Sequence, residues 1–216
     1  VERVSEPGAA ARHSARLGRL AEGDTVAVYD FGGGTFDAAV VRVTGSGSEI
    51  LGQPQGLERL GGVDLDQAVV AHVNAALDGA LSQLDPSDPE VHRALVALQA
   101  ECTAAKEALS ADTDATVTVA APGLDTQVRL TRAELEAAIR PRLVETLGAL
   151  DRTVASAGLG LEDLAGVVMV GGSSRIPVVA EVVATHTGRP LLVDADPKLV
   201  VVLGAGPAVA PQQAPV

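Results

Sequence analysis

An acid, three glycines and a hydroxyl follow one another between two apolar stretches of this chain. Residues 30–37 read Asp-Phe-Gly-Gly-Gly-Thr-Phe-Asp, and they separate two runs with the composition of strands, 25–29 and 38–43. Consecutive glycines tolerate positive φ and let several backbone N–H groups approach one anion. Asp30 is suited to a hydrated divalent cation, and the Thr35 hydroxyl can bind a phosphate oxygen. The stretch therefore predicts one half of an ATP site.

A plain β-hairpin is the alternative interpretation of residues 30–37, with the glycines serving only the turn. A two-residue hairpin usually needs one glycine, however, and a strand of buried composition rarely ends in an acid that has no use. We therefore prefer phosphate binding for this stretch, and the rest of the chain strengthens that preference.

A second glycine turn, residues 170–177, follows the apolar run 166–170 and opens a predicted helix with Pro177 near its first position. Backbone N–H groups at a helix start favour anions or polar edges of a ligand. The flat guanidinium of Arg175 can stack on an aromatic base. A loop with an N-cap serine explains the same residues without any ligand, and both interpretations stay open.

Composition and charge exclude several classes of function. The chain has 216 residues, enough for one large or two small domains with a real core. Its 16 Lys and Arg against 28 Asp and Glu give a net charge of −12, which argues against a nucleic-acid binder. Cys102 is the single cysteine, which fits a reducing cytoplasm and excludes a disulfide framework. No apolar run approaches the roughly 20 residues that cross a membrane, so we expect no membrane contact.

Alternating strand and helix patterns predict an α/β fold. The expected strands are 25–30, 36–44, 48–54 and 166–170, with a separate hairpin of 116–119 and 126–130. The expected helices are 9–20, 64–79, 89–110, 131 to about 157, and 176–187. Asp88 is the expected N-cap of the third helix, and Thr131 with Glu134 forms a capping box for the fourth. We expect Pro141 to kink or divide that fourth helix.

Five segments resemble, in order, motifs of the DnaK-type heat-shock chaperone ATPases, which have the actin/sugar-kinase fold. Four of them are residues 30–37, 60–66 (Leu-Gly-Gly-Val-Asp-Leu-Asp), 106–110 (Lys-Glu-Ala-Leu-Ser) and 171–177. Residues 5–11, Ser-Glu-Pro-Gly-Ala-Ala-Ala, are similar to that family's Asn-Glu-Pro-Thr-Ala-Ala-Ala segment. The resemblance covers nearly the whole chain, and it is specific because several independent motifs fall in sequence.

The resemblance implies an actin-like (ribonuclease H-like) ATPase lobe, a mixed sheet flanked by helices with an inserted α+β subdomain. Residues 20–60 and 137–206 would form the core subdomain of a second lobe, and 61–136 the inserted outer subdomain. Residues 1–19 would lead in from a first lobe, and 207–216 would be a flexible tail. That first lobe carries the family's first phosphate loop and catalytic lysine, which no segment here supplies. We therefore expect a fragment that does not hydrolyse ATP by itself.

The resemblance implies ATP or ADP with Mg²⁺ as the ligand. The residues on the phosphate side would be Glu6, Asp30, Gly32, Gly33, Gly34, Thr35 and Asp37. The glycines and Thr35 would cradle the β- and γ-phosphates, and Asp30 would hold the magnesium through water. Glu6 and Asp37 would join Asp30 in orienting the attacking water, because phosphoryl transfer depends mostly on positioning and charge neutralisation.

The other implied nucleotide contacts are Gly61, Gly62, Lys106, Ser110, Gly171, Gly172, Ser173 and Arg175. Helical geometry supports Lys106 and Ser110, because residues four apart share a face, although a solvated helix face is the plainer alternative. Thr103, Glu107 and Lys198 depart from residues that the family often uses for adenosine or near the end of the lobe. We therefore expect phosphate binding to be intact and base recognition to be weakened or altered.

Three functions remain open on these grounds. The first is an ATP-binding lobe of a chaperone ATPase, the second a degenerate module that senses nucleotide or docks a partner, and the third a filament-forming actin relative. The insertion 61–136 and the Glu6-Pro7 segment favour the chaperone branch over filament formers. The intact acids and Thr35 favour an enzyme over a degenerate module. By resemblance, a nucleotide-exchange factor would dock on the outer subdomain.

Overall fold

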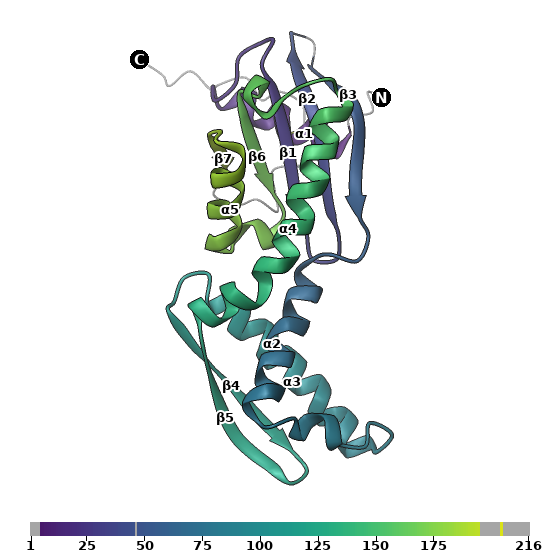
Figure 1. The fold of residues 1–216 in the computed structure, drawn as a ribbon, viewed down its shortest axis with the longest axis vertical. Coiled ribbons are helices and arrows are strands. Elements are labelled where there is room, and N and C mark those ends of the chain that lie inside the picture. The colour runs from purple at the N-terminus through teal and green to yellow at the C-terminus, as the bar shows by residue number, and fades with distance from the viewer. Residues whose placement is uncertain (1–4, 46, 195–203, 205–216) are drawn as a thin grey trace, which may run out of the picture.

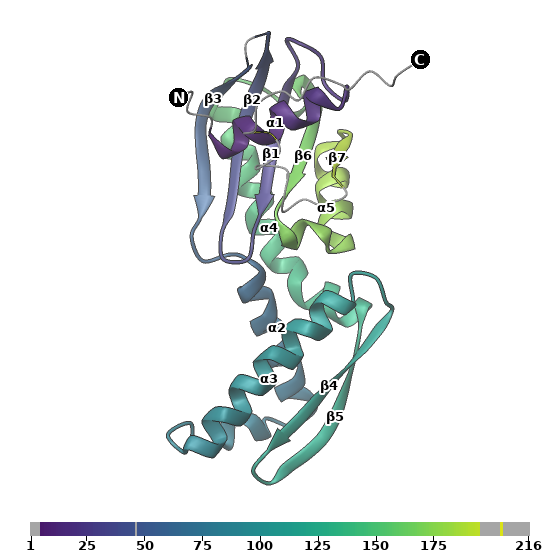
Figure 2. The same cartoon turned by 180° about the vertical axis from the view of Figure 1, so that it is seen from behind.

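The structure is a computed structural model, and it describes residues 5–45, 47–194 and 204. Its shape is elongated, with a sheet between helices in the upper part and two helices beside a hairpin in the lower part (Figures 1 and 2). The departure at Lys198 and the expected tail 207–216 lie outside the described residues.

A mixed five-stranded sheet in the order β3-β2-β1-β6-β7 forms the upper part. Its strands are β1 (Thr25–Phe31), β2 (Phe36–Thr44), β3 (Gly47–Leu57), β6 (Gly166–Val170) and β7 (Leu191–Val193). β1 pairs antiparallel with β2 and parallel with β6. The register sets Asp30 opposite both Asp37 and Val170, so the glycine turns after β1 and β6 lie side by side. This confirms the α/β class and the four expected sheet strands; β7 was not expected.

The two faces of the sheet are covered by different helices. Helix α1 (Glu6–Arg16) covers one face, and α4 (Arg132–Ser156) with α5 (Pro177–Thr187) covers the other (Figures 1 and 2). Along β1, Val26 and Val28 pack with the α1 side, whereas Ala27, Tyr29 and Phe31 pack with the α4 side. The alternation follows from the two-residue period of a strand, and β1 is a central strand that is buried except at Thr25 and Asp30, which are partly exposed.

All three aromatic residues of the chain lie together on the α4 face of the sheet. Tyr29, Phe31 and Phe36 are fully buried, and each pair of rings is edge-on with centroids 4.6 to 6.3 Å apart. Such edge-to-face pairs are favoured by the ring quadrupoles. The cluster anchors the ends of β1 and β2 that carry the first glycine turn.

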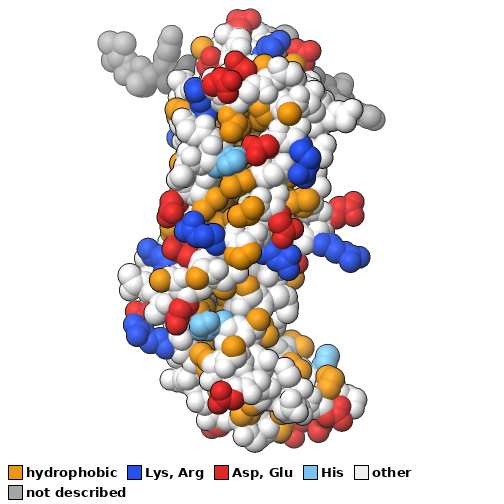
Figure 3. Space-filling view, in the orientation of Figure 1, with side chains coloured by type: hydrophobic (Ala, Val, Ile, Leu, Met, Phe, Trp, Pro, Cys, Tyr) orange, Lys and Arg blue, Asp and Glu red, His pale blue; other side chains and the backbone are white. Residues whose placement is uncertain are grey.

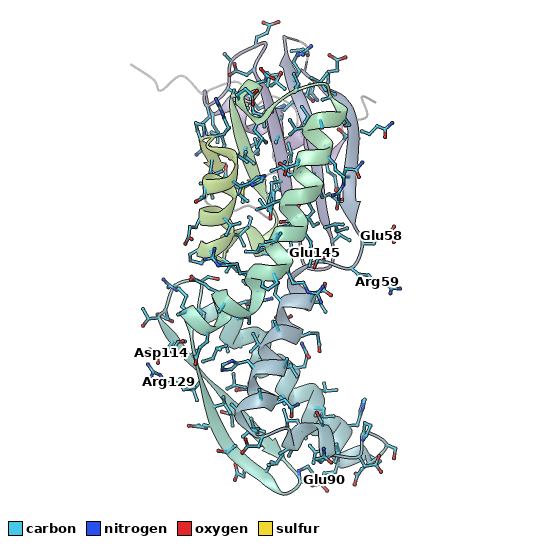
Figure 4. All side chains as sticks on the ribbon, viewed as in Figure 1. Glu58, Arg59, Glu90, Asp114, Arg129 and Glu145 are labelled. Atoms are coloured by element: carbon cyan, nitrogen blue, oxygen red, sulfur yellow. The ribbon has the colours of Figure 1, made fainter. Side chains whose placement is uncertain are left out.

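The lower part consists of α2 (Gly62–Ala76), α3 (Pro89–Ala108) and the hairpin β4 (Asp114–Ala121) and β5 (Leu124–Thr131). The two predicted helix caps are confirmed. Asp88 accepts a hydrogen bond from Glu90 N at 2.7 Å, and Thr131 and Glu134 bond each other reciprocally. On the outside of the hairpin, Asp114 and Arg129 form an exposed ion pair (Figure 4).

Helix α4 belongs to both parts of the molecule. The prediction was that Pro141 would kink or divide this helix. It is one continuous helix with Pro141 inside it, so it is not divided, and the ribbon changes direction along its length (Figure 1). A proline removes one helical hydrogen bond. Buried Ile139 and Leu143 on either side hold the helix in place, and their packing outweighs that loss.

The surface shows no concentrated patch of one kind on the face seen in Figure 3, where acidic and basic side chains are interspersed. The large exposed apolar side chains are scattered over several elements. Within the described ranges, no helix combines the length and apolarity that a membrane span requires.

Candidate functional site

The two glycine turns are tied directly to each other. Ser173 Oγ, in the turn after β6, donates a hydrogen bond to the carbonyl oxygen of Gly32 at 2.8 Å. Gly171 has a φ of 86°, and a Cβ there would lie 2.3 Å from the carbonyl oxygen of Phe31. Only glycine fits that combination of backbone angle and close approach. The second turn therefore packs against the end of β1, next to Asp30.

The first glycine turn does not use positive φ, contrary to the sequence expectation. None of Gly32, Gly33 and Gly34 has a positive φ, because Gly32 N–H closes the turn on the carbonyl of Thr35 at 3.0 Å. The glycines instead leave open space beside the turn, since a Cβ on Gly33 or Gly34 would meet nothing within 4 Å. Among the described residues, the N–H groups of Gly33 and Gly34 have no acceptor. These donors are therefore open to an anion that approaches from solvent.

The first turn of α2 supports the glycine turn from behind. Gly62 N–H donates to the carbonyl of Gly32 at 3.0 Å, and Val63 N–H donates to that of Gly33 at 2.8 Å. A Cβ on Gly61 would lie 2.5 Å from the backbone of Gly34, so a side chain at position 61 would push the two segments apart. The first turn of α2 thus binds the carbonyl oxygens of Gly32 and Gly33, and among the described residues the N–H groups of Gly33 and Gly34 stay without an acceptor.

Three acids converge on the end of β1. Burial raises the pKa of Asp30 to about 6, and the neighbouring carboxylates of Asp37 and Glu6 add to the rise. Among the described residues, no three acidic, histidine or cysteine side chains are close enough to hold a metal ion directly. A cation here would need water and ligand oxygens to complete its coordination.

Lys106 and Asp66 form a buried ion pair on the wall between α2 and α3. Lys106 Nζ lies 2.7 Å from Asp66 Oδ1 and donates a hydrogen bond to the carbonyl of Gly62 at 3.0 Å. Asp66 was not predicted as a site residue. It could have been found, because it falls on the buried stripe of α2 with Leu65 and Val69, where an unpaired charge is costly.

Ser110 lies beyond the end of the observed helix, although the predicted helix 89–110 included it. Helix α3 ends at Ala108, and Ser110 N–H bonds the carbonyl of Glu107 at 3.1 Å in the following turn. Ser110 therefore does not share a helical face with Lys106, as was predicted, although both residues line the same cleft. Thr103 lines it too, with its hydroxyl donating to the carbonyl of Gln99 at 3.0 Å.

The second turn is a 3₁₀ turn, Gly172–Arg175, and α5 begins after it at Pro177. Ile176 holds the N-cap position and supplies no capping side chain, so the alternative of a simple N-cap serine is wrong. Ser174 instead bonds the carbonyl of Gly171 at 2.6 Å, which closes the turn on itself. Arg175 stays exposed on the cleft wall.

These segments enclose one cleft of about 950 Å³, within the range of small-molecule sites. The predicted residues that line it are Glu6, Asp30, Gly32, Gly33, Gly62, Lys106, Ser110, Gly171, Gly172, Ser173 and Arg175. The predicted residues Gly34, Thr35, Asp37 and Gly61 do not line it. Gly61 is buried behind the turn, whereas Gly34, Thr35 and Asp37 are exposed outside the wall. Asp66, Thr103 and Glu107 also line the cleft.

Comparison with known proteins gives one consistent answer. The family model described as "Hsp70 protein" matches residues 3–211. The chain is 43% identical over 202 residues to the chaperone protein HscA homolog of Pseudomonas putida, 41% over 202 residues to that of Pseudomonas fluorescens, and 40% over 203 residues to that of Bordetella pertussis. Each match covers 94% of this chain and only 30 to 31% of the relative. The chain, with its mixed sheet between helices and its cleft between two glycine turns, therefore belongs to the Hsp70 family.

Proposed function

We propose that this chain is the ATP-binding lobe of a DnaK-like chaperone ATPase and that its cleft binds Mg-ATP and Mg-ADP. One observation carries the proposal: four segments far apart in sequence, 30–33, 62–66, 103–111 and 170–176, supply the wall of a single cleft. The wall combines acids, the N–H group of Gly33, which has no acceptor among the described residues, and the guanidinium of Arg175. That combination suits a cation, a phosphate chain and an aromatic base in turn.

The phosphates would lie over the first glycine turn. The N–H groups of Gly33 and Gly34 have no acceptor among the described residues; Gly33 lines the cleft, and Gly34 and Thr35 are exposed just outside its wall. The acids Asp30 and Glu6 line the same cleft, and they repel phosphate unless a cation stands between them. A bound Mg²⁺ would neutralise phosphate charge there, with Asp30 holding it through water. Asp30 and its neighbours would also orient a water toward the terminal phosphate.

The nucleoside would lie toward the second turn. Gly172, Ser173 and Arg175 of the second turn line the cleft together with Lys106 and Ser110. Arg175 is exposed, and no described carboxylate pairs with it, so its flat face is available to a base. Glu107 also lines the cleft, and its carboxylate would accept hydrogen bonds from O–H or N–H groups of the nucleoside.

Hydrolysis and partners extend the proposal to the full-length protein. The chain spans about a third of the length of the relatives it matches. We infer that turnover requires a first lobe that supplies a second phosphate loop and a lysine, and that an exchange factor docks on residues 61–136. A cytoplasmic location is part of the same proposal, and the buried free thiol of Cys102 is consistent with a reducing compartment.

Calorimetric titration of Mg-ADP and Mg-ATP into the chain, alone and with a first lobe added, tests the proposal. We expect weak binding by the chain alone, tighter binding with both lobes and ATP turnover only then. Gly33→Ala should weaken binding without affecting folding, because Gly33 lines the cleft and a Cβ there meets open space in the protein but would stand where phosphate approaches. Gly148→Ala, within α4, is the matched control. If neither the folded chain alone nor the folded chain with the first lobe binds Mg-ADP or Mg-ATP, the proposal is overturned.

A non-catalytic nucleotide sensor is the second candidate, and a specific observation favours it. Thr103 and Glu107 line the cleft where many Hsp70 proteins are expected to offer an acid and an arginine. A sensor would bind Mg-ADP with both lobes present but would not release phosphate from ATP. A single-turnover assay with both lobes therefore separates the two candidates.

A further inference from the structure

The hydroxyl group of Ser173 already has a partner within the protein. Ser173 is 7% exposed, and its Oγ donates a hydrogen bond to the carbonyl oxygen of Gly32 at 2.8 Å. A serine hydroxyl carries one proton, so Ser173 has none left to donate to a ligand, although it lines the cleft. Its side chain therefore contacts the first glycine turn and is not a free donor for a nucleoside.

The carbonyl oxygen of Gly32 accepts two hydrogen bonds. Besides Ser173 Oγ, the N–H of Gly62 at the start of α2 donates to it at 3.0 Å, and a carbonyl oxygen has two lone pairs. The segments are closely packed there, because a Cβ on Gly62 would lie 3.0 Å from Ser173 Oγ and 3.5 Å from Gly33 Cα. Two elements far apart in the sequence, α2 and the second glycine turn, therefore fix this carbonyl together.

The N–H of Gly33 belongs to the same peptide group as the carbonyl of Gly32. A trans peptide group is planar, and its C=O and N–H point in opposite directions. Fixing the Gly32 carbonyl therefore also fixes the direction of the Gly33 N–H, which has no acceptor among the described residues. The next peptide group is held differently, because the carbonyl of Gly33 accepts from Val63 N–H of α2 at 2.8 Å and, among the described residues, from none of the second turn.

We propose that Ser173 is a positioning residue for phosphate and not a nucleoside contact: its hydroxyl fixes the peptide group of Gly32 and Gly33 and so orients the Gly33 N–H toward phosphate. The inference rests on the proposed nucleotide site. Ser173 belongs to the turn on which the nucleoside would lie, so a nucleoside that orders this turn also orders a phosphate donor. One hydroxyl then couples the binding of the two halves of the ligand.

The sequence allows these peptide groups to be observed selectively. The chain contains four Gly-Gly peptide bonds, whose N–H groups belong to Gly33, Gly34, Gly62 and Gly172. In a chain whose glycines carry ¹³C at the carbonyl carbon and ¹⁵N at the nitrogen, an NMR experiment that requires a ¹³C–¹⁵N bond shows these four amides, and single alanine variants assign them. Adenosine, which has no phosphate, and Mg-pyrophosphate, which has no nucleoside, are the two probes.

In the wild type, we expect Mg-pyrophosphate to move the amide signals of Gly33 and Gly34. Adenosine should move those of Gly172 and Gly33 but not that of Gly34. Ser173→Ala should weaken Mg-pyrophosphate binding about fivefold, which corresponds to the loss of one hydrogen bond, and should leave adenosine binding unchanged. In that variant adenosine should still move the Gly172 signal and no longer that of Gly33.

Ser174→Ala is the matched control. Ser174 is 3% exposed, does not line the cleft, and donates from its Oγ to the carbonyl of Gly171 at 2.6 Å within the same turn. This variant loses a buried serine hydroxyl but keeps both bonds to the Gly32 carbonyl, so it should bind Mg-pyrophosphate as the wild type does. In Ser173→Ala the Gly32 carbonyl keeps its bond from Gly62, so we expect that variant to fold. If it does not fold, the wild-type adenosine titration still decides.

Three results would overturn the inference alone. They are a folded Ser173→Ala chain that binds Mg-pyrophosphate as the wild type does, an equal loss of that binding in Ser174→Ala, and a Gly33 signal that does not respond to adenosine in the wild type. All three leave the phosphate site in place, because Mg-pyrophosphate still moves the Gly33 and Gly34 signals of the wild type. If neither probe moves any of the glycine signals, the proposed function fails and the inference fails with it.

Discussion

The hydroxyl of Tyr29 on β1 lies 2.5 Å from the hydroxyl of Thr146 on α4, although 117 positions separate the two residues. Both side chains are fully buried. Thr146 Oγ1 donates its own proton to the carbonyl of Leu143 at 2.6 Å, so Tyr29 must be the donor between the two hydroxyls. Burial raises the pKa of Tyr29 to about 12, which keeps that donor protonated. One directed hydrogen bond thus joins the central strand to the long helix.

Removing that donor should destabilise the fold modestly. Tyr29→Phe keeps the ring packing and loses one buried hydrogen bond, so we expect the free energy of unfolding to fall by about 1 kcal/mol. Thr146→Val should cost more, about 1 to 3 kcal/mol, because it leaves the Tyr29 hydroxyl buried without a partner. Urea unfolding followed by circular dichroism measures both. Equal stability of wild type and Thr146→Val would contradict this assignment of donor and acceptor.

Asp30 should reduce the stability of the folded chain at neutral pH. Its folded pKa of about 6 lies above the ordinary value of 3.8, so the folded state binds the proton more tightly than the unfolded state does. The stability that this proton contributes is complete below about pH 4 and is lost as the pH rises through about 6. Asp30→Asn should therefore stabilise the chain by about 1 kcal/mol at pH 7.5, after discounting for partial exposure, and by nothing at pH 4.

Urea midpoints of wild type and Asp30→Asn at both pH values check this, in the absence of nucleotide. A difference that is the same at pH 4 and pH 7.5 would show that the substitution acts through packing and not through the carboxylate charge. The same variant should weaken Mg-ADP binding, which would set function against stability at this residue.

Gly171 should be the least replaceable of the cleft glycines. Gly171→Ala combines left-handed backbone strain with a Cβ 2.3 Å from the Phe31 carbonyl oxygen, so we expect a loss above about 3 kcal/mol or failure to fold. Gly188, the C-cap of α5, has a φ of 62° and open space around it, so Gly188→Ala isolates the strain at about 1 kcal/mol. Thermal unfolding of both variants measures the difference. Equal losses of stability in Gly171→Ala and Gly188→Ala would mean that the second glycine turn moves away from β1 to accommodate the Cβ.

Binding of ADP should depend on magnesium, whereas binding of adenosine should not. Asp30 and Glu6 border the cleft, and Lys106 is already matched by Asp66, so little uncompensated positive charge faces the phosphates in the described wall. Removing Mg²⁺ with EDTA should weaken ADP binding at least about tenfold. Adenosine measured in the same buffer is the control. ADP affinity that is unchanged by EDTA would mean that backbone N–H groups alone neutralise the phosphates.

Elements with strong local signals were predicted closely. The strand 166–170 matches β6 to the residue because it is uniformly apolar and bounded by glycines, and the Asp88 and Thr131 caps are local hydrogen-bond patterns. The three-residue strand β7 carries no alternation that could reveal it. Helix α3 ends two residues early because its last turn closes on Leu109, a choice set by packing and not by sequence pattern.

The site was predicted only in part from single residues. The glycine turns, Asp30 and Lys106 stand out by type and spacing, yet their meeting in one cleft depends on the strand order, which the resemblance supplied. Local pattern does not fix the exposure of Asp37, which pairs with Asp30 in register but lies outside the cleft wall. Asp66 was overlooked because a carboxylate inside a helix usually faces solvent, although its spacing from Val69 and Val73 puts it on the buried stripe of α2.

The aromatic cluster has an optical consequence. The chain contains no tryptophan and a single tyrosine, so its intrinsic ultraviolet emission comes from Tyr29 alone. That ring packs against Phe36, its hydroxyl bonds Thr146, and Tyr29 lies three residues before Gly32, the first glycine of the turn after β1. The fluorescence quenching and lifetime of Tyr29 therefore report, without any added dye, whether the sheet is packed against helix α4.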